Sequence, residues 1–364
     1  MKKVAIMTTG GDCSGLNATI HRLVVGGLRR GWKMLGILDG TDGLTRTDTP
    51  HYTEFGYTTL PVECARMAGS FLRNGNSHAL NFESAYKTGQ RQEFSGRMKK
   101  SLRAMDLDAL VIIGGNGSLS LANRSQDIYG NIQLIAIPKT IDMDIPLTDT
   151  TLGFATAVQQ LTGFCDQLML TARSHHRWFV VQTMGRDTGH LALHAGIAIG
   201  ADAIIIPEIK WKPGALIAHL RKIEKEQDRD YGIVLVAEAI TLRGHSGRPA
   251  DIISREMTRA GIQNRTGFPE HTQRAGDTTA NDRILATQMA DAALCAIENN
   301  ETYVMVSAQG GNCKTVPLAE MFAAGEHKPD PNIPDAIVSN WFVPVQSPLL
   351  SVAANMGIYV GEIK

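Results

Sequence analysis

Continuous apolar runs of strand length recur through the first half of the chain, and each ends in a turn that contains glycine or proline. Four of them read VAIMTTG, MLGILDG, ALVIIGG and LIAIPKT, at residues 4–10, 34–40, 109–115 and 134–140. Hydrophobicity that is continuous rather than alternating indicates strands buried on both faces, as in parallel sheets covered by helices. The stretch LNATIHRLVVGGLRR (16–30) has a helical pattern and separates the first two runs.

A second series of the same kind follows. We expect further strands at 178–184, 203–208, 232–240 and 303–308, and helices at 191–200, 214–227 and 281–299. Residues 43–106 are polar and poor in strand patterns, and residues 314–348 have the pattern of a loop. The alternation predicts an α/β fold of two doubly wound, Rossmann-like lobes with mainly parallel sheets, and an active site in the cleft between them. We expect one lobe to comprise 1–153 and about 275–325, and the other 154–274 and about 326–364.

The composition fits a globular protein of this kind. The chain has 364 residues, more than a single hydrophobic core usually serves, so two domains or one large split domain are expected. The net charge is zero, which favours neither nucleic acid nor an anionic membrane as a partner. Five scattered cysteines without a CxxC pair predict reduced thiols, and no apolar run has the length of a signal peptide or a membrane span. These features predict a cytoplasmic protein.

Three loops rich in glycine or acidic residues follow predicted strands. They read TTGGDCSGLNA, GGNGSLS and PKTIDMD. In open α/β sheets, ligands bind at the carboxyl ends of the strands, where glycines let the backbone approach an anion and a helix N-terminus favours negative charge. A single glycine pair is more often ordinary turn chemistry, but three such loops together predict a polyphosphate site. None of them matches the P-loop or the GxGxxG pattern.

Arginines and a histidine gather near the strand ends of the second series. Arg177 precedes one predicted strand and Arg186 follows it, while Arg265, His271 and Arg274 lie within ten residues. Guanidinium groups bind phosphate through paired hydrogen bonds, although a single arginine is more often a solvated surface charge. The grouping therefore indicates a second phosphate site.

Taken in order, these strings resemble the phosphofructokinases. The resemblance runs from Met1 to about Gly310 and rests on GGDCSGLNA, GTDGL, GGNGS, PKTIDMD, SHHR, MGRDTGH, PE, HTQR and NDRILA. Members of the family transfer a phosphoryl group to the 1-hydroxyl of fructose 6-phosphate, giving fructose 1,6-bisphosphate in glycolysis. The resemblance implies that the lobe of 1–153 and about 275–325 binds the phosphoryl donor, and that the other lobe binds the sugar phosphate.

The family pattern also implies roles for individual residues. Asp142 matches the general base that takes the proton of the sugar hydroxyl. Gly11 and Thr140 match the groups that hold the transferred phosphoryl group, and Arg186 matches the group that stabilises charge on it. Lys139 stands where an ammonium group can neutralise charge on the leaving group. The donor-binding residues would be Gly11, Arg73, Asn76, Gly115, Asn116, Gly117 and Ser118. The sugar-phosphate pocket would comprise Thr140, Asp142, Asp144, Met184, Gly185, Arg186, Glu238, His271 and Arg274, with Arg177 and Arg265 reaching it from a neighbouring subunit. A homodimer or homotetramer is therefore expected.

Three positions depart from the family pattern. Asn116 replaces an aspartate that ordinarily helps to bind Mg²⁺, the expected cofactor, and a neutral amide is a poorer ligand for a hard cation. Met143 stands where the family usually has a polar residue. Asn76 aligns with the donor-phosphate arginine of many members, and Arg73 lies three residues earlier.

The donor remains open between ATP and pyrophosphate. Gly117 leaves room for the α-phosphate of ATP, whereas Lys139 stands where many ATP enzymes have glycine and can occupy the position of that phosphate. We expect ATP, with pyrophosphate as the alternative. A regulatory homologue that binds sugar phosphate without turnover is less favoured, because Gly11, Thr140, Asp142 and Arg186 are all present. The alternative that the chain is a NAD or lipid kinase, enzymes that share GGDG-type loops, does not explain the MGR and HTQR strings.

Overall fold

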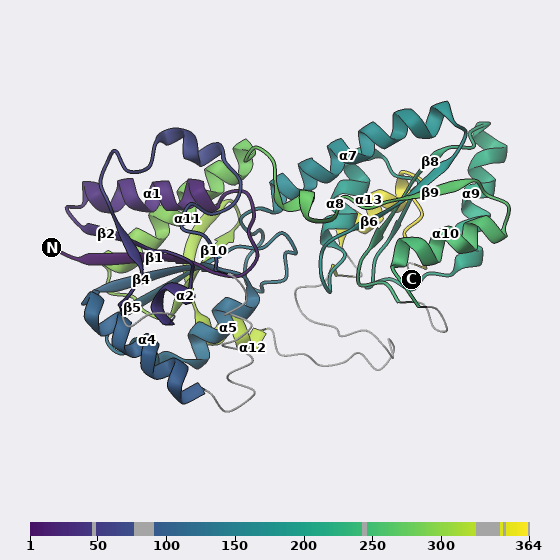
Figure 1. Ribbon diagram of the computed structural model, residues 1–364. Coiled ribbons are helices and arrows are strands. Elements are labelled where there is room, and N and C mark those ends of the chain that lie inside the picture. Colours follow the sequence, from purple (N-terminus) through teal and green to yellow (C-terminus); the bar gives the residue numbers. More distant parts are fainter. Residues whose placement is uncertain (46–48, 76–90, 242–245, 325–342, 345–346, 363–364) are drawn as a thin grey trace. The chain divides into compact units, whose positions relative to one another are not determined.

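The continuous apolar runs fold into strands of two sheets in a computed structural model of the chain (Figure 1). The structure describes residues 1–45, 49–75, 91–241, 246–324, 343–344 and 347–362. Two compact units divide the chain. Unit 1 comprises Met1–Ile141, Ile145–Thr156 and Arg274–Gly325, and unit 2 comprises Asp142–Asp144, Ala157–Gln273 and Glu326–Lys364.

Seven strands form the sheet of unit 1 within the described residues. In sheet order they are β11 (Asn312–Pro317), β10 (Val304–Gln309), β5 (Gln133–Pro138), β4 (Ala109–Gly114), β1 (Lys3–Thr8), β2 (Lys33–Ile37) and β3 (Tyr52–Phe55). The five inner strands run parallel, and the edge strands β3 and β11 are antiparallel to their neighbours. Because the inner strands are buried on both faces, their central residues are mostly apolar.

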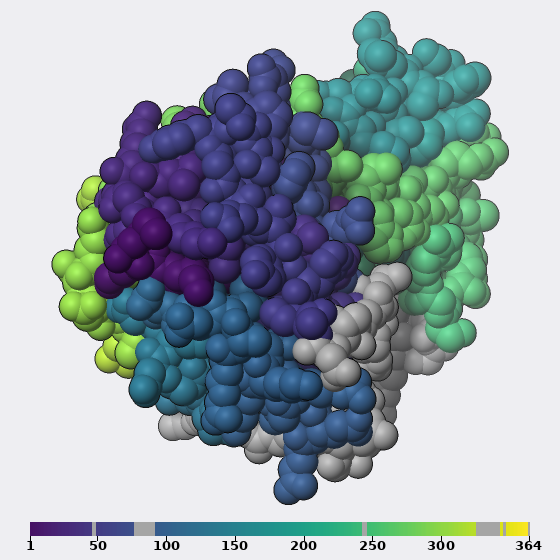
Figure 2. All heavy atoms as spheres, turned by 60° about the vertical axis from the view of Figure 1, so that its left-hand side comes forward, coloured from purple at the N-terminus to yellow at the C-terminus, as the bar shows by residue number. Residues whose placement is uncertain are grey.

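Helices cover both faces of this sheet (Figure 1). One face carries α1 (Leu16–Arg29) and α11 (Ala280–Glu298), and the other carries α4 (Arg91–Met105), α5 (Asn116–Arg124) and α12 (Leu318–Ala324). Shorter elements are α2 (Asp42–Thr45), η1 (Val62–Arg66) and α6 (Gln126–Tyr129). The purple-to-blue N-terminal segments form one continuous surface of unit 1 (Figure 2). Between the sheet and α4 and α5 lies a core that contains Met98, Leu102, Leu110, Ile112 and Leu119.

Unit 2 has a smaller, wholly parallel sheet. In order its described strands are β7 (Ala203–Ile205), β8 (Gly232–Ala237), β6 (Trp178–Thr183) and β9 (Asn264–Gly267). Residues of α9 (Pro213–Gln227) and α10 (Pro249–Arg259) form a core with one face, among them Leu216, Leu220, Ile253 and Met257. The remaining helices are α7 (Phe154–Ser174), α8 (His190–Ile199), α13 (Pro348–Asn355) and the short η2 (Glu270–Arg274).

The C-terminal segment adds to the edge of this small sheet. The backbone N–H of Ile204 donates to the carbonyl of Tyr359 at 2.8 Å, and the N–H of Tyr359 donates to the carbonyl of Asp202 at 3.0 Å. Tyr359 therefore forms a parallel bridge with Ala203 in β7. A segment more than a hundred positions later in the chain thus forms hydrogen bonds with backbone groups of the edge strand β7.

The α/β class and the strands and helices expected from the apolar runs are confirmed. The expectation of loop at 314–348 is wrong at its start, because β11 and α12 occupy 312–324. The strand β11 was missed because its sequence NCKTVP is half exposed and mixes polar with apolar residues. The PDPNIP string lies outside the described residues. No helix among the described residues is long and apolar enough to span a membrane.

Candidate active site

The loop after β1 holds the first group of candidate residues, all in unit 1. The ammonium group of Lys139, which is 2% exposed, donates a hydrogen bond to the carbonyl of Thr9 at 3.0 Å and another to the carbonyl of Gly11. Gly10 has a φ of 77°, and a Cβ atom built there would lie 3.5 Å from the Ser118 hydroxyl and 3.7 Å from the Lys139 ammonium. The structure therefore brings the loops that carry Gly11, Ser118 and Lys139 into contact, as the sequence predicts.

The second glycine loop joins β4 to α5. A Cβ atom on Gly115 would lie 3.3 Å from the carbonyl of Lys139, so this loop lies against the end of β5. Asn116 and Gly117 open α5, where backbone N–H groups have no partner in the preceding turn. A Cβ atom on Gly117 would meet nothing within 4 Å, so the space beside this residue is open.

The predicted donor-binding residue Arg73 lies in a loop that is tied to the first glycine loop. The Asn74 amide donates to the carbonyl of Gly10 at 2.8 Å, and the Thr8 hydroxyl donates to the carbonyl of Arg73 at 3.0 Å. The exposed guanidinium of Arg73 lies 3.8 Å from the carboxylate of Asp39. Asn76 lies outside the described residues. Sequence reasoning did not identify Asn74 as a residue that holds this loop.

Arg274 belongs to unit 1, although the sequence places it with the sugar-phosphate residues. Its guanidinium donates to the carbonyl of Asp12 at 3.1 Å. A Cβ atom on Gly11 would lie 2.6 Å from one of its terminal nitrogens. The guanidinium therefore covers Gly11, and it fills the space that a side chain at position 11 would need.

Thr140 is held by hydrogen bonds to Thr151 and Leu152, which lie beside it in an extended segment. Its N–H donates to the carbonyl of Leu152 at 3.2 Å, and its carbonyl accepts a 2.6 Å hydrogen bond from the Thr151 hydroxyl.

The buried carboxylate of Asp282 accepts hydrogen bonds from the N–H groups of Gly153 and Thr156 at 2.9 and 2.8 Å. Burial raises the pKa of Asp282. The string NDRILA contained Asp282, but only the folded chain shows which groups it holds.

The acidic residues of the TIDMD loop begin a second cluster, in unit 2. Asp142 and Asp144 are 4% and 5% exposed. Met143 between them has a φ of 51°, in the left-handed region that residues with a side chain rarely adopt. The guanidinium of Arg186 lies 3.8 Å from the carboxylate of Asp144. Two residues predicted for the sugar-phosphate pocket are therefore paired in one unit.

The Met-Gly-Arg loop after β6 contacts this acidic loop. The hydroxyl of Thr188, which is 1% exposed, donates to the backbone carbonyl of Asp142 at 2.7 Å and lies 3.1 Å from that of Gly185. The N–H of Arg186 donates to the carboxylate of Glu238 at 2.7 Å. Gly185 and Arg186 have φ values of 134° and 52°. The turn is therefore held in an unusual backbone conformation by side chains from other segments. Thr188 was not identified from the sequence.

Two predicted residues lie apart from this cluster. Arg177 precedes the first residue of β6, whereas Met184 follows its last residue, so a six-residue strand separates them. Arg265 lies on β9 opposite Phe179, near the same starting end of β6. His271, by contrast, is exposed on η2, whose Gln273 accepts a hydrogen bond from the N–H of Met184 at 3.1 Å. The structure of one chain does not bring Arg177 and Arg265 together with Met184 and Gly185.

A buried carboxylate lies behind the Met-Gly-Arg loop. One oxygen of Glu208 accepts hydrogen bonds from the N–H groups of Gly189 and Val343 at 2.8 and 3.1 Å. The other oxygen is buried and has no hydrogen-bond partner among the described residues. Burial raises the pKa of Glu208 from 4.5 to about 7. This carboxyl group therefore titrates near neutrality.

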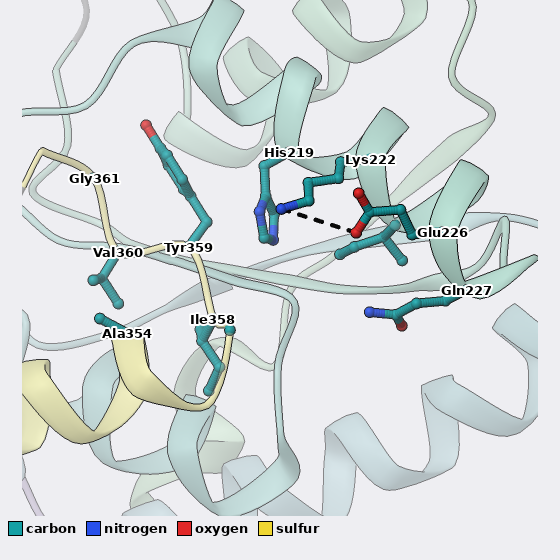
Figure 3. Close-up of a pocket in the computed structure, with 11 residues that line it drawn as sticks. His219, Lys222, Glu226, Gln227, Ala354, Ile358, Tyr359, Val360 and Gly361 are labelled. Atoms are coloured by element: carbon teal, nitrogen blue, oxygen red, sulfur yellow. Dashed lines mark ion pairs between the residues drawn. The ribbon is translucent and has the colours of Figure 1, made fainter.

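A pocket of about 450 Å³ lies elsewhere in unit 2, between α9 and the C-terminal segment (Figure 3). His219, Lys222 and Glu226 line it from the helix, and Tyr359 lines it from the other side. Lys222 and Glu226 form an ion pair at 3.9 Å. None of the residues predicted from the sequence lines this pocket, so it is distinct from both clusters.

Comparisons with known proteins show which family the sequence resembles. The family model described as phosphofructokinase matches residues 3–297. The chain is 34% identical over 380 residues to "ATP-dependent 6-phosphofructokinase 2" of Nostoc sp., covering 99% of both chains. It is 32% identical over 333 residues to "ATP-dependent 6-phosphofructokinase" of Staphylococcus aureus, covering 91% of this chain and 96% of that relative.

Solved structures show the same fold. Phosphofructokinase from Saccharomyces cerevisiae superposes with a TM-score of 0.77 at 27% identity; the match covers 89% of this chain and 46% of that one, so this chain spans about half of the yeast subunit. A pyrophosphate-dependent phosphofructokinase from Marinobacter aquaeolei matches with a TM-score of 0.70 at 18% identity, covering 88% of this chain and 84% of that one. At that identity the likeness shows the fold alone.

Proposed function

Because this chain belongs to the phosphofructokinase family, we propose that it transfers the terminal phosphoryl group of ATP to the 1-hydroxyl of fructose 6-phosphate. The products are fructose 1,6-bisphosphate and ADP, and the hydroxyl proton passes to a base on the protein. The observation that carries this proposal is the 34% identity, over 99% of both chains, to an ATP-dependent 6-phosphofructokinase.

The glycine loops of unit 1 would hold the donor phosphates. The backbone at Gly115 and Ser118 supplies N–H groups at the N-terminus of α5, which favours anions, and the loop that contains Gly11 lies beside it. The open space beside Gly117 supports ATP as the donor, because a nucleotide carries an α-phosphate that pyrophosphate lacks.

A divalent metal ion suits this donor, and we propose that it is Mg²⁺. The described residues contain no group of three or more histidine, cysteine or acidic side chains that would hold a metal ion by themselves. Mg²⁺ commonly takes one or two protein ligands and completes its coordination with phosphate oxygens and water. The residues present therefore fit an ion that arrives with the nucleotide, with the amide oxygen of Asn116 as a protein ligand. When bound, the ion would neutralise charge on the donor phosphates.

The cluster of unit 2 would bind and activate the sugar phosphate. Asp142 is the proposed general base, and general base catalysis contributes about 10²- to 10⁴-fold to the rate. Arg186 would stabilise negative charge on the phosphoryl group during transfer. Its guanidinium lies 3.8 Å from the carboxylate of Asp144, which helps to hold it in place. Met184, Gly185, Glu238 and His271 complete the proposed sugar-phosphate pocket.

The protein is proposed to act as a homo-oligomer. Arg177 and Arg265 lie near the starting end of β6, whereas the Met-Gly-Arg loop follows its other end. Their position supports the proposal that they serve the sugar site of a neighbouring subunit. Mixing inactive Arg265→Ala and Asp142→Asn chains should then restore part of the activity in hybrid oligomers.

The proposed function is tested by a coupled assay for fructose 1,6-bisphosphate. Wild-type and Asp142→Asn chains are compared with fructose 6-phosphate and Mg²⁺, and with either ATP or pyrophosphate. Turnover with ATP that Asp142→Asn abolishes supports the proposal. Turnover with pyrophosphate alone assigns the protein to the other donor class, and sugar-phosphate binding without turnover identifies a regulatory homologue.

A further inference from the structure

We propose that Thr188 is a positioning residue for the general base, and that its hydroxyl holds the TIDMD loop in a conformation that Met143 alone disfavours. The inference rests on the proposed function, in which Asp142 takes the proton of the sugar hydroxyl. Thr188 itself contacts the backbone of Asp142 and so acts through it.

The hydrogen bond from Thr188 has the geometry of a strong contact. Its hydroxyl lies 2.7 Å from the carbonyl oxygen of Asp142, the most common distance for an O–H···O bond, and 3.1 Å from that of Gly185. A hydroxyl has one proton to donate, so the shorter contact to Asp142 is the main one. The N–H of Thr188 donates separately to the carbonyl of Gly185 at 3.0 Å. One residue thus fixes both the base loop and the turn that contains Arg186.

The loop needs such a support because of the residue beside the base. Met143 has a φ of 51°, which brings Cβ of an L-residue too close to the backbone. Asparagine tolerates this region better than other residues with a side chain, since its short polar side chain can bond locally. A left-handed methionine persists only where surrounding contacts over-determine it. The bond from Thr188 to the preceding carbonyl is such a contact.

The position of Asp142 affects the rate because a base must lie within hydrogen-bond reach of the proton that it abstracts. A displacement of about 1 Å at a reacting group can lower a rate by about a hundredfold. If the Thr188 bond is lost, the Asp142 backbone can move and the carboxylate moves with it. The consequence should appear in kcat, whereas substrate affinity should change little.

The chain offers a matched control in Thr183. This residue ends β6, five positions before Thr188, and both side chains are 1% exposed. The hydroxyl of Thr183 is buried without a hydrogen-bond partner among the described residues, whereas that of Thr188 bonds to Asp142. Valine has the shape of threonine but no hydroxyl. Thr183→Val therefore removes a buried hydroxyl without removing a hydrogen bond within the described residues, whereas Thr188→Val removes the bond to Asp142.

The experiment compares wild type with Thr188→Val, Thr188→Ser, Thr183→Val, Met143→Asn and the double variant Thr188→Val/Met143→Asn. Steady-state kinetics give kcat and both KM values, and hydrogen exchange by mass spectrometry follows the backbone amides of residues 142–145. We expect Thr188→Val to lower kcat by about tenfold or more with little change in KM, because the base moves while the binding groups stay. Thr188→Ser should retain kcat, Thr183→Val should match wild type, and Met143→Asn should recover part of kcat in the Thr188→Val background.

Hydrogen exchange decides the inference even if the wild-type chain has no turnover, an outcome that would overturn only the proposed function. Faster exchange at residues 142–145 in Thr188→Val than in Thr183→Val, slowed again by Met143→Asn, supports the positioning role. Equal exchange in the two valine variants overturns it. Equal losses of kcat in those two variants, accompanied by equal losses of thermal stability, also overturn it, since they would show a general packing effect.

Discussion

The ammonium group of Lys139 donates a hydrogen bond to the backbone carbonyl of Gly11, and a second one, at 3.0 Å, to the carbonyl of Thr9. The side chain is 2% exposed, so these carbonyls replace the water that an ammonium group would otherwise bind. The bonds connect the end of β5 to the glycine loop after β1. Lys139 therefore holds the part of the loop that the proposed function assigns to the donor phosphates.

Replacing Lys139 with methionine keeps the length of the side chain and removes both hydrogen bonds. We expect kcat with ATP to fall by about tenfold to a hundredfold, because the phosphate-binding loop loses its anchor and the site loses a cation. Steady-state kinetics with ATP and with pyrophosphate check this. A rise in ATP turnover, together with strong wild-type activity on pyrophosphate, would show instead that Lys139 excludes ATP.

Asp142→Asn tests the general base with almost no change of shape. We expect kcat to fall by about 10²- to 10⁴-fold while the KM for fructose 6-phosphate changes little, since an amide cannot accept the proton. Asp149→Asn is the control, because this exposed aspartate accepts a hydrogen bond from the N–H of Gly310, which an amide oxygen can still accept. Comparable losses in both variants would argue against Asp142 as the base.

Gly11→Ala probes the guanidinium that covers the loop. The new Cβ would lie 2.6 Å from a terminal nitrogen of Arg274, closer than such atoms approach, so the guanidinium must move and its bond to the carbonyl of Asp12 is weakened. The reaction has two KM values, one for the donor and one for fructose 6-phosphate, and we expect Gly11→Ala and Arg274→Ala to raise the same one of them. The double variant should lose little more activity than either single variant, because both substitutions disturb the same contact. Fully additive losses in this double-mutant cycle would show that the two positions act separately.

The raised pKa of Glu208 predicts that the free energy of unfolding depends on pH. Burial raises its pKa from 4.5 to about 7 in the folded chain. The folded chain therefore binds more protons than the unfolded chain between these values, and the free energy of unfolding falls as the pH rises through this range. The contribution is fully present below about pH 4.5 and is lost above about pH 7.

Glu208→Gln removes this titration while an amide oxygen can still accept from Gly189 and Val343. Relative to wild type, we expect the variant to unfold at a higher temperature at pH 8 and at a similar temperature at pH 5. The difference in stability should approach roughly 3 kcal/mol, because the pKa rises from 4.5 to about 7 on folding. Calorimetric unfolding of both chains at the two pH values measures it, and a gap independent of pH would contradict the prediction.

The sequence predicted the inner strands because burial on both faces leaves a continuous apolar pattern. It missed β3, whose residues Tyr52–Phe55 are mostly exposed at a sheet edge, and β9, whose four residues NRTG give no periodic signal. It also predicted that the loops of Gly11, Ser118 and Lys139 would meet, since the carboxyl ends of parallel strands share an edge.

The supporting residues of both clusters could not be predicted in the same way. Asn74, Thr188 and Asp282 act through hydrogen bonds to backbone atoms 46 to 129 positions away in the chain. Such partners depend on the three-dimensional packing of loops, which hydrophobic periodicity does not encode. The left-handed conformation of Met143 was hidden for a related reason, because its residue type favours ordinary backbone angles.

The bridge between Tyr359 and Ala203 has a consequence for synthesis on the ribosome. Domains generally fold as units while translation proceeds at about 5 to 20 residues per second. The edge of the small sheet stays without this partner until Tyr359 has left the exit tunnel, long after β7 and β8 have emerged. β5 likewise waits for β10, some 170 residues later, to pair along its outer side. A nascent chain arrested before residue 300 should therefore expose the outer edges of β5 and β7, which β10 and Tyr359 later cover, and it would depend on chaperones to avoid aggregation.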